Sequence, residues 1–124
     1  MLVRSQRLLV LLMGMPGEGR LFDYALNLGA RMEADLDLLW LAHPEDAVEA
    51  LGTCTTKAAR QGIRLNFRFP EGSSPWDKVR RYLNLNAPPP MAAIGLRELA
   101  KKNMKEIRML NRSGFPITLV SFKS

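Results

Sequence analysis

The chain has 124 residues, a length typical of one domain, and we expect residues 1–124 to fold as a single unit. A hydrophobic share of 47% predicts an ordinary packed core. The single cysteine excludes an internal disulfide framework, and no apolar stretch reaches the roughly 18 residues that a membrane-spanning helix needs. These features predict a soluble, cytoplasmic protein.

The net charge of +6 is distributed unevenly along the chain. Residues 1–50 hold four basic and eight acidic side chains, whereas residues 51–124 hold fourteen basic and four acidic ones. Such a chain either carries a well-solvated surface or steers toward an anionic partner.

The apolar run Leu8–Met13 has no charge and is closed by a glycine-rich turn. This pattern is typical of a strand buried on both faces, so we expect it at the centre of a parallel sheet. A helix over Glu18–Glu33 and a second buried strand over Leu36–Ala42 follow. The apolar residues of that helix recur at helical spacing on one face: Leu21, Ala25, Leu28, Gly29 and Met32.

Pro44 predicts the start of a second helix, which ends at Gly62. Ile63–Phe69 alternates apolar and polar residues, a pattern typical of a half-buried edge strand. The residues of the second helix that we expect to point inward are Val48, Leu51, Thr55 and Ala58.

Ser74 predicts the N-cap of a third helix, with Pro75 at its first position and Asp77 reaching back. This helix runs to about Leu85 and is broken by Ala87–Pro90. The remaining predicted elements are a strand over Met91–Leu96, a helix over Arg97–Arg112 and a strand over Pro116–Phe122.

Strands and helices alternate throughout, which predicts the α/β class and an open parallel sheet of five strands with helices on both faces. Ligands of such sheets lie at the carboxyl ends of the strands, where the strand order reverses. We therefore place a candidate crevice beside Leu8–Met13, formed by eight residues: Gly14, Met15, Gly17, Gly19, Ala42, His43, Gly95 and Arg97.

Three phrases in this order resemble the universal stress protein family: Leu8–Pro16 its opening strand and loop, Asp23–Arg31 its first helix, and Phe115–Val120 its closing strand. The resemblance covers almost the whole chain. It implies a Rossmann-like fold of the adenine nucleotide alpha hydrolase type with strand order 3-2-1-4-5. It also implies a homodimer formed through Pro116–Phe122, and an unpaired apolar edge strand of this kind is usually covered.

Many members of that family bind ATP, and this chain departs from their pattern twice. Their first strand ends in an aspartate, where this chain has Met13, whose thioether is a poor hydrogen-bond acceptor. Their phosphate loop carries Gly-x-x-Gly, about nine residues, and Gly-Ser or Gly-Thr after the fourth strand. Here Gly95 is followed by a helical sequence, and the next glycine is Gly114. We therefore predict no cofactor and disfavour ATP or AMP.

The segment Gly14–Leu21 nearly matches a P-loop. Arg20 replaces the lysine, Leu21 replaces the magnesium-binding hydroxyl, and Glu18 puts a negative charge where a phosphate would lie. A plain strand-to-helix turn is the favoured interpretation. If a small anion binds, the N–H groups of Gly17–Arg20 are its predicted site.

We predict neither catalytic residues nor a metal site. His43 is the only histidine and has no second ligand at metal-binding spacing. Cys54 lies within a helix without an evident base, as a structural thiol does. Asp35 and Asp37 share one strand face at the end away from the crevice, and we assign them to solvent.

The predicted last helix carries an apolar arc and a basic stripe. The arc that we expect to face the sheet contains Leu96, Ala100, Met104, Ile107 and Leu110. The stripe contains Arg97, Lys101, Lys105, Arg108 and Arg112. It is either a solvated face or a contact for nucleic-acid phosphates, anionic lipid or an acidic protein, and few aromatic residues support base stacking.

Three functional hypotheses follow. The leading one is a universal stress protein-like homodimer that does no chemistry and acts as a regulatory or accessory domain. The second is a nucleotide-binding stress protein with altered contacts. The third is a basic adaptor whose last helix binds nucleic acid or an acidic partner.

Overall fold

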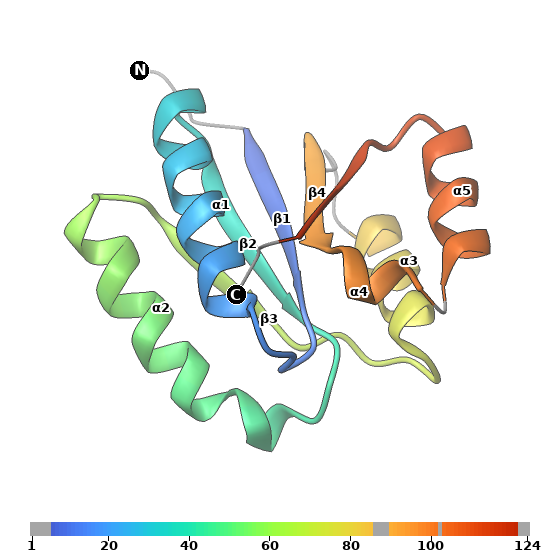
Figure 1. Ribbon diagram of the computed structural model, residues 1–124, viewed down its shortest axis with the longest axis horizontal. Helices are drawn as coiled ribbons and strands as arrows, with labels where there is room; N and C mark the ends of the chain where they lie inside the picture. Colours follow the sequence, from blue (N-terminus) through green and yellow to red (C-terminus); the bar gives the residue numbers. More distant parts are fainter. Residues whose placement is uncertain (1–5, 86–89, 102, 122–124) are drawn as a thin grey trace.

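A computed structural model describes residues 6–85, 90–101 and 103–121. The five strands are β1 (Arg7–Leu12), β2 (Asp35–Trp40), β3 (Leu65–Arg68), β4 (Ala92–Leu96) and β5 (Ile117–Val120). The helices are α1 (Glu18–Met32), a short 3₁₀ turn η1 (Pro44–Ala47), α2 (Val48–Arg60), α3 (Pro75–Leu85), α4 (Arg97–Ala100) and α5 (Met104–Arg112). Figure 1 shows these elements alternating along the chain.

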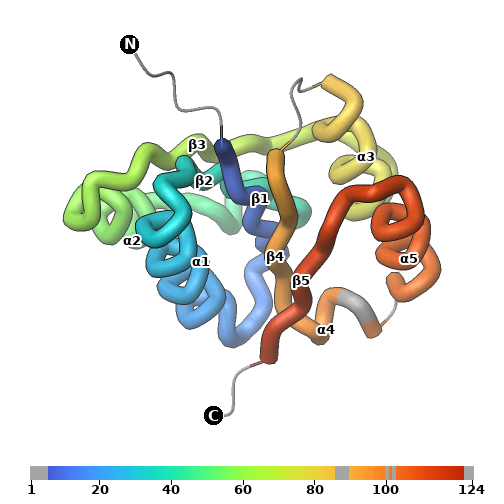
Figure 2. Tube along the Cα trace, turned by 90° about the horizontal axis from the view of Figure 1, so that it is seen from above, coloured from blue at the N-terminus to red at the C-terminus, as the bar shows by residue number. Residues whose placement is uncertain are grey.

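The strands form one parallel sheet in the order β3-β2-β1-β4-β5, with β1 at the centre. This confirms the predicted class, the strand order that the family resemblance implied and the central place of the first apolar run. Figure 2 shows α1 and α2 on one side of the sheet and α3 and α5 on the other.

Two apolar cores lie on the two faces of the sheet, because successive side chains of a strand point to opposite sides. Leu8, Val10 and Leu12 of β1 pack in the core beneath α1 and α2. Leu9 and Leu11 pack in the core beneath α3 and α5. The central strand therefore contributes to both layers, as a run without charged residues predicts.

The buried stripe of α2 differs from the prediction. Val48 is 73% exposed, and Leu51 and Thr55 are also exposed, whereas Ala58 is buried as predicted and Cys54 is buried in place of Thr55. The chain enters this helix through η1, and a 3₁₀ turn has three residues per turn instead of 3.6, so the face that meets the sheet is shifted. Small side chains fill that face.

The predicted N-cap of α3 is confirmed. The main-chain N–H of Asp77 donates to Ser74 Oγ at 3.1 Å, and Pro75 is the first helical residue. Asp77 Oδ2 accepts from the N–H of Ser73 at 3.0 Å, which lowers the pKa of this carboxyl.

The single helix predicted over Arg97–Arg112 is wrong, because the chain forms two helices, α4 and α5. Asn103, at the cap of α5, has non-helical backbone angles, and its Nδ2 donates to Leu99 O at 2.8 Å. The break changes the apolar arc. Leu99 and Ile107 are buried, whereas Met104 is 43% exposed.

Asp35 and Asp37 are buried, which corrects their assignment to solvent. Asp37 is 0% exposed and lies under α3. Its Oδ2 accepts from Arg7 Nη1 at 2.9 Å and from the Tyr82 hydroxyl, and its Oδ1 accepts from Asn66 Nδ2 at 3.1 Å. Burial, together with Asp37, raises the pKa of Tyr82 well above its ordinary value. The Asp37 carboxyl is tolerated inside the protein because it is paired with Arg7 and because both of its oxygens accept hydrogen bonds.

Candidate functional site

The candidate crevice lies where strand order reverses, at the carboxyl ends of β1 and β4. Three connections reach this edge: the loop from β1 to α1, the loop from β2 to η1 and the junction of β4 with α4. The sequence placed its candidate residues in these connections, and the fold puts them there.

The loop after β1 turns through two glycines with positive φ, Gly14 (φ 78°) and Gly17 (φ 94°). A Cβ on Gly14 would lie 3.5 Å from the Trp40 ring, and a Cβ on Gly17 would lie 3.7 Å from Leu96 Cδ1. Met15 packs against the cores of both faces. Apolar side chains from β2 and β4 therefore border the loop where a crevice was predicted.

The side chain of Glu18 folds back onto the end of the central strand. Its Oε2 accepts from the main-chain N–H of Met13 at 2.7 Å, and its Oε1 accepts from the N–H of Gly14 at 2.8 Å. Consecutive main-chain N–H groups beside a helix N-terminus are the donors that anion sites use. In this chain, a carboxylate of the protein itself occupies those two donors.

Burial raises the pKa of Glu18, and the N–H groups of Met13, Gly14 and Met15 oppose that shift. The rise shows that the cost of removing the carboxylate from water outweighs the stabilisation by its donors. Glu18 is also the first residue of α1, where a negative charge is favoured by the helix dipole.

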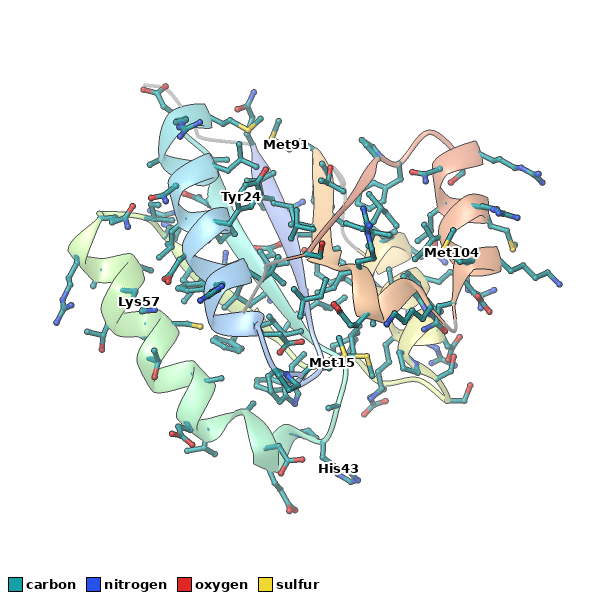
Figure 3. All side chains as sticks on the ribbon, viewed as in Figure 1. Met15, Tyr24, His43, Lys57, Met91 and Met104 are labelled. Carbon is teal, nitrogen blue, oxygen red and sulfur yellow. The ribbon has the colours of Figure 1, made fainter. Side chains whose placement is uncertain are left out.

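The other predicted crevice residues are less enclosed. Gly19 and Arg97 are exposed in the first turns of α1 and α4, and Ala42 is half-buried. His43 is exposed, and Figure 3 shows its side chain at the outer end of its loop. The carbonyl of His43 accepts from Trp40 Nε1 at 2.7 Å, so its main chain holds the indole in place.

The connection after β4 leaves no space for a loop. β4 ends at Leu96 and α4 begins at Arg97. Gly95 is buried, and a Cβ there would lie 3.3 Å from Leu99 Cδ2. The shortened segment expected from the sequence is thus a direct strand-to-helix junction.

The described residues hold no cluster of three His, Cys, Asp or Glu side chains that could bind a metal. Burial raises the pKa of Cys54 to about 11, so its thiol is protonated and weakly nucleophilic near neutral pH. Leu21, at the hydroxyl position of a P-loop, is 0% exposed and packs in the core.

The basic stripe is divided by the break between α4 and α5. All five of its side chains are exposed, but only Lys105, Arg108 and Arg112 share a helix. Arg97 and Lys101 belong to the preceding turn. The continuous row that the sequence predicted is therefore reduced to three residues.

The architecture is an α/β fold of the universal stress protein type. The chain is similar to a crystal structure described as a protein from the universal stress protein family from Burkholderia pseudomallei, with a TM-score of 0.71 and 16% sequence identity. The alignment covers 93% of this chain and 95% of that one. At this identity the likeness concerns the fold. No family model matches the chain, and no curated protein matches it.

Sequence reasoning missed the contacts that the loop after β1 makes with its surroundings. It placed a negative charge at Glu18 but did not predict that its carboxylate binds Met13 and Gly14. The available signal was a glutamate in the first helical turn just after Gly17, since helix starts favour acidic side chains that accept main-chain N–H groups. The contacts of Trp40 and Leu96 depend on strand pairing, which no local pattern shows.

Replacing Glu18 by alanine tests its structural role. We expect Glu18→Ala to lower the free energy of unfolding by about 1–3 kcal/mol, because the partly buried N–H of Met13 and the exposed N–H of Gly14 lose their acceptor. Urea unfolding measures this change. Glu49→Ala, on an exposed helical position of α2, is the control and should change stability by less than about 0.5 kcal/mol. Equal effects of the two substitutions would contradict the assignment.

Proposed function

We propose that this protein is a non-catalytic regulatory or accessory domain of the universal stress protein type, which does not bind ATP in the way that is usual for that family. The observation that carries the proposal is the Glu18 carboxylate on the N–H groups of Met13 and Gly14. A phosphate or a nucleotide would have to displace this carboxylate and then face its charge.

Two further features support the absence of a usual nucleotide site. Met13 stands where the family resemblance implies an aspartate, so the end of β1 has no side-chain acceptor for a nucleotide. β4 passes directly into α4, so the chain offers no glycine loop to surround phosphates at that junction. The chain therefore lacks both the aspartate and the phosphate loop of the usual nucleotide site, and the Glu18 carboxylate binds the N–H groups of Met13 and Gly14 instead.

A homodimer is the second part of the proposal. β5 lies at one edge of the sheet, next to β4. The N–H of Ile117 is met by Asn111 Oδ1 at 3.3 Å, while Ile117, Leu119 and Val120 remain only half-buried. A partly exposed apolar edge strand favours pairing with another strand, and a second copy supplies one.

Thermal unfolding with ATP, ADP or AMP and magnesium tests the nucleotide part. We expect no saturable rise in Tm, because binding at 100 times the Kd would add about 2.7 kcal/mol and shift Tm by several degrees. Glu18→Ala removes one of the two features that oppose nucleotide binding, the Glu18 carboxylate, and keeps the other, the direct junction of β4 with α4. If this junction also excludes phosphates, the variant gains no nucleotide binding either. A saturable rise for the unmodified protein would overturn this part and favour a nucleotide-binding protein with altered contacts.

Light scattering tests the dimer. We expect the protein to have the mass of a dimer and Thr118→Lys, on the exposed side of β5, to shift it to the monomer, because an edge lysine opposes strand pairing. Thr56→Lys on the exposed face of α2 is the matched control and should remain dimeric. A monomeric unmodified protein, or a dimer indifferent to Thr118→Lys, would contradict pairing through β5.

A further inference from the structure

A groove separates α3 from α5 on the face of the sheet away from α1 and α2. Its volume is about 540 Å³, within the range of small-molecule sites. It is distinct from the crevice, since none of the crevice residues lines it. Six large apolar side chains contribute to its wall: Trp76, Leu83, Met91, Met109, Leu110 and Phe115. Figure 3 shows Met91 at the start of β4.

The groove leaves apolar surface accessible to solvent. Met109 is 56% exposed, whereas Trp76 is 6% exposed. The Nε1 atom of Trp76 is the single buried side-chain nitrogen or oxygen without a hydrogen-bond partner in the part of the chain that the structure describes. Because this atom is buried, it offers no accessible donor to a ligand, and the accessible wall of the groove is mainly apolar.

The charges around the groove are mainly positive. Arg80 lines it one helical turn after Trp76, and its ion pair with Asp77 is long, at 3.9 Å, and 67% of the Arg80 side chain is exposed. Lys105 and Arg112 lie four residues before and three residues after Met109, so they are its neighbours on the surface of α5. Both are exposed, and neither forms an ion pair with a described residue. Glu106 is the one acidic side chain of the wall.

We propose that this groove binds an anionic amphiphile of the medium-chain fatty acid class. The alkyl chain occupies the apolar part between Leu83, Met109 and Phe115. The carboxylate is attracted by Arg80 of α3 and by Lys105 and Arg112 of α5. An uncharged amphiphile gains only the apolar contacts, and a cationic amphiphile is repelled by the basic side chains around the groove. This site is distinct from the nucleotide crevice, and it adjoins the proposed dimer edge, because Pro116 lines the groove.

Calorimetric titration with decanoate, decanol and decylamine tests the ligand class. We expect saturable binding of decanoate, weaker binding of decanol and none of decylamine. Removing either charge of the wall should change decanoate binding, in opposite directions. We expect Arg80→Gln to weaken binding about 3–10-fold and Glu106→Gln to strengthen it a few-fold. Each change corresponds to about the interaction free energy of one partly exposed charge. Equal binding of all three probes, or no binding, would overturn the proposal.

Two methionines of α5 provide the matched test of location. Met109 lines the groove, whereas Met104 is not among its lining residues. Figure 3 shows Met104 at the first turn of the same helix. Met109→Glu should weaken decanoate binding at least about 10-fold, and Met104→Glu by no more than about 2-fold, although each adds the same charge at an exposed position. Equal losses would place the probe elsewhere. If Met109→Glu alone converts a dimer to a monomer, a second copy covers the groove and the amphiphile proposal is wrong.

Discussion

The hydrogen bonds between the Glu18 carboxylate and the N–H groups of Met13 and Gly14 are the constraint on which the loop after the central strand depends. They join the end of the central strand to the first turn of α1, so strand, loop and helix form one closed unit. A loop of this kind would otherwise present free donors to an anion. The protein has a fold of the universal stress protein type, and the carboxylate of its own Glu18 accepts from these two donors.

A second carboxylate, that of the fully buried Asp37, joins the sheet to α3. Asp37 joins Arg7 of β1, Asn66 of β3 and Tyr82 of α3, and so connects four elements through one charge. Breaking a buried pair of this kind leaves an uncompensated charge, which costs about 3–5 kcal/mol. The two carboxylates differ in what they restrain: Asp37 holds a helix on the sheet, and Glu18 closes a loop.

Local chemistry predicted much of this fold from the sequence. The uncharged run of β1, the Ser74 cap and the start of α1 at Glu18 follow from rules that act within a few residues, and all are present. The predictions were wrong where contacts between separate elements determine which residues are buried or where a helix ends. The phase of α2 depends on η1, the helix break depends on Asn103, and the burial of Asp37 depends on Tyr82, 45 residues away. The topology places the candidate residues near the carboxyl ends of β1 and β4, but the hydrogen bonds of Glu18 could not be predicted from it.

Backbone NMR of Met13 and Gly14 as a function of pH tests the central claim most directly. If Glu18 binds both N–H groups, their chemical shifts titrate together with the Glu18 side chain, with a midpoint above the ordinary pKa of a glutamate, because burial raises the pKa of this carboxyl. Their exchange with solvent is also slow. Rapidly exchanging amides whose shifts do not change with pH, beside a Glu18 that titrates at its ordinary value, would contradict the account.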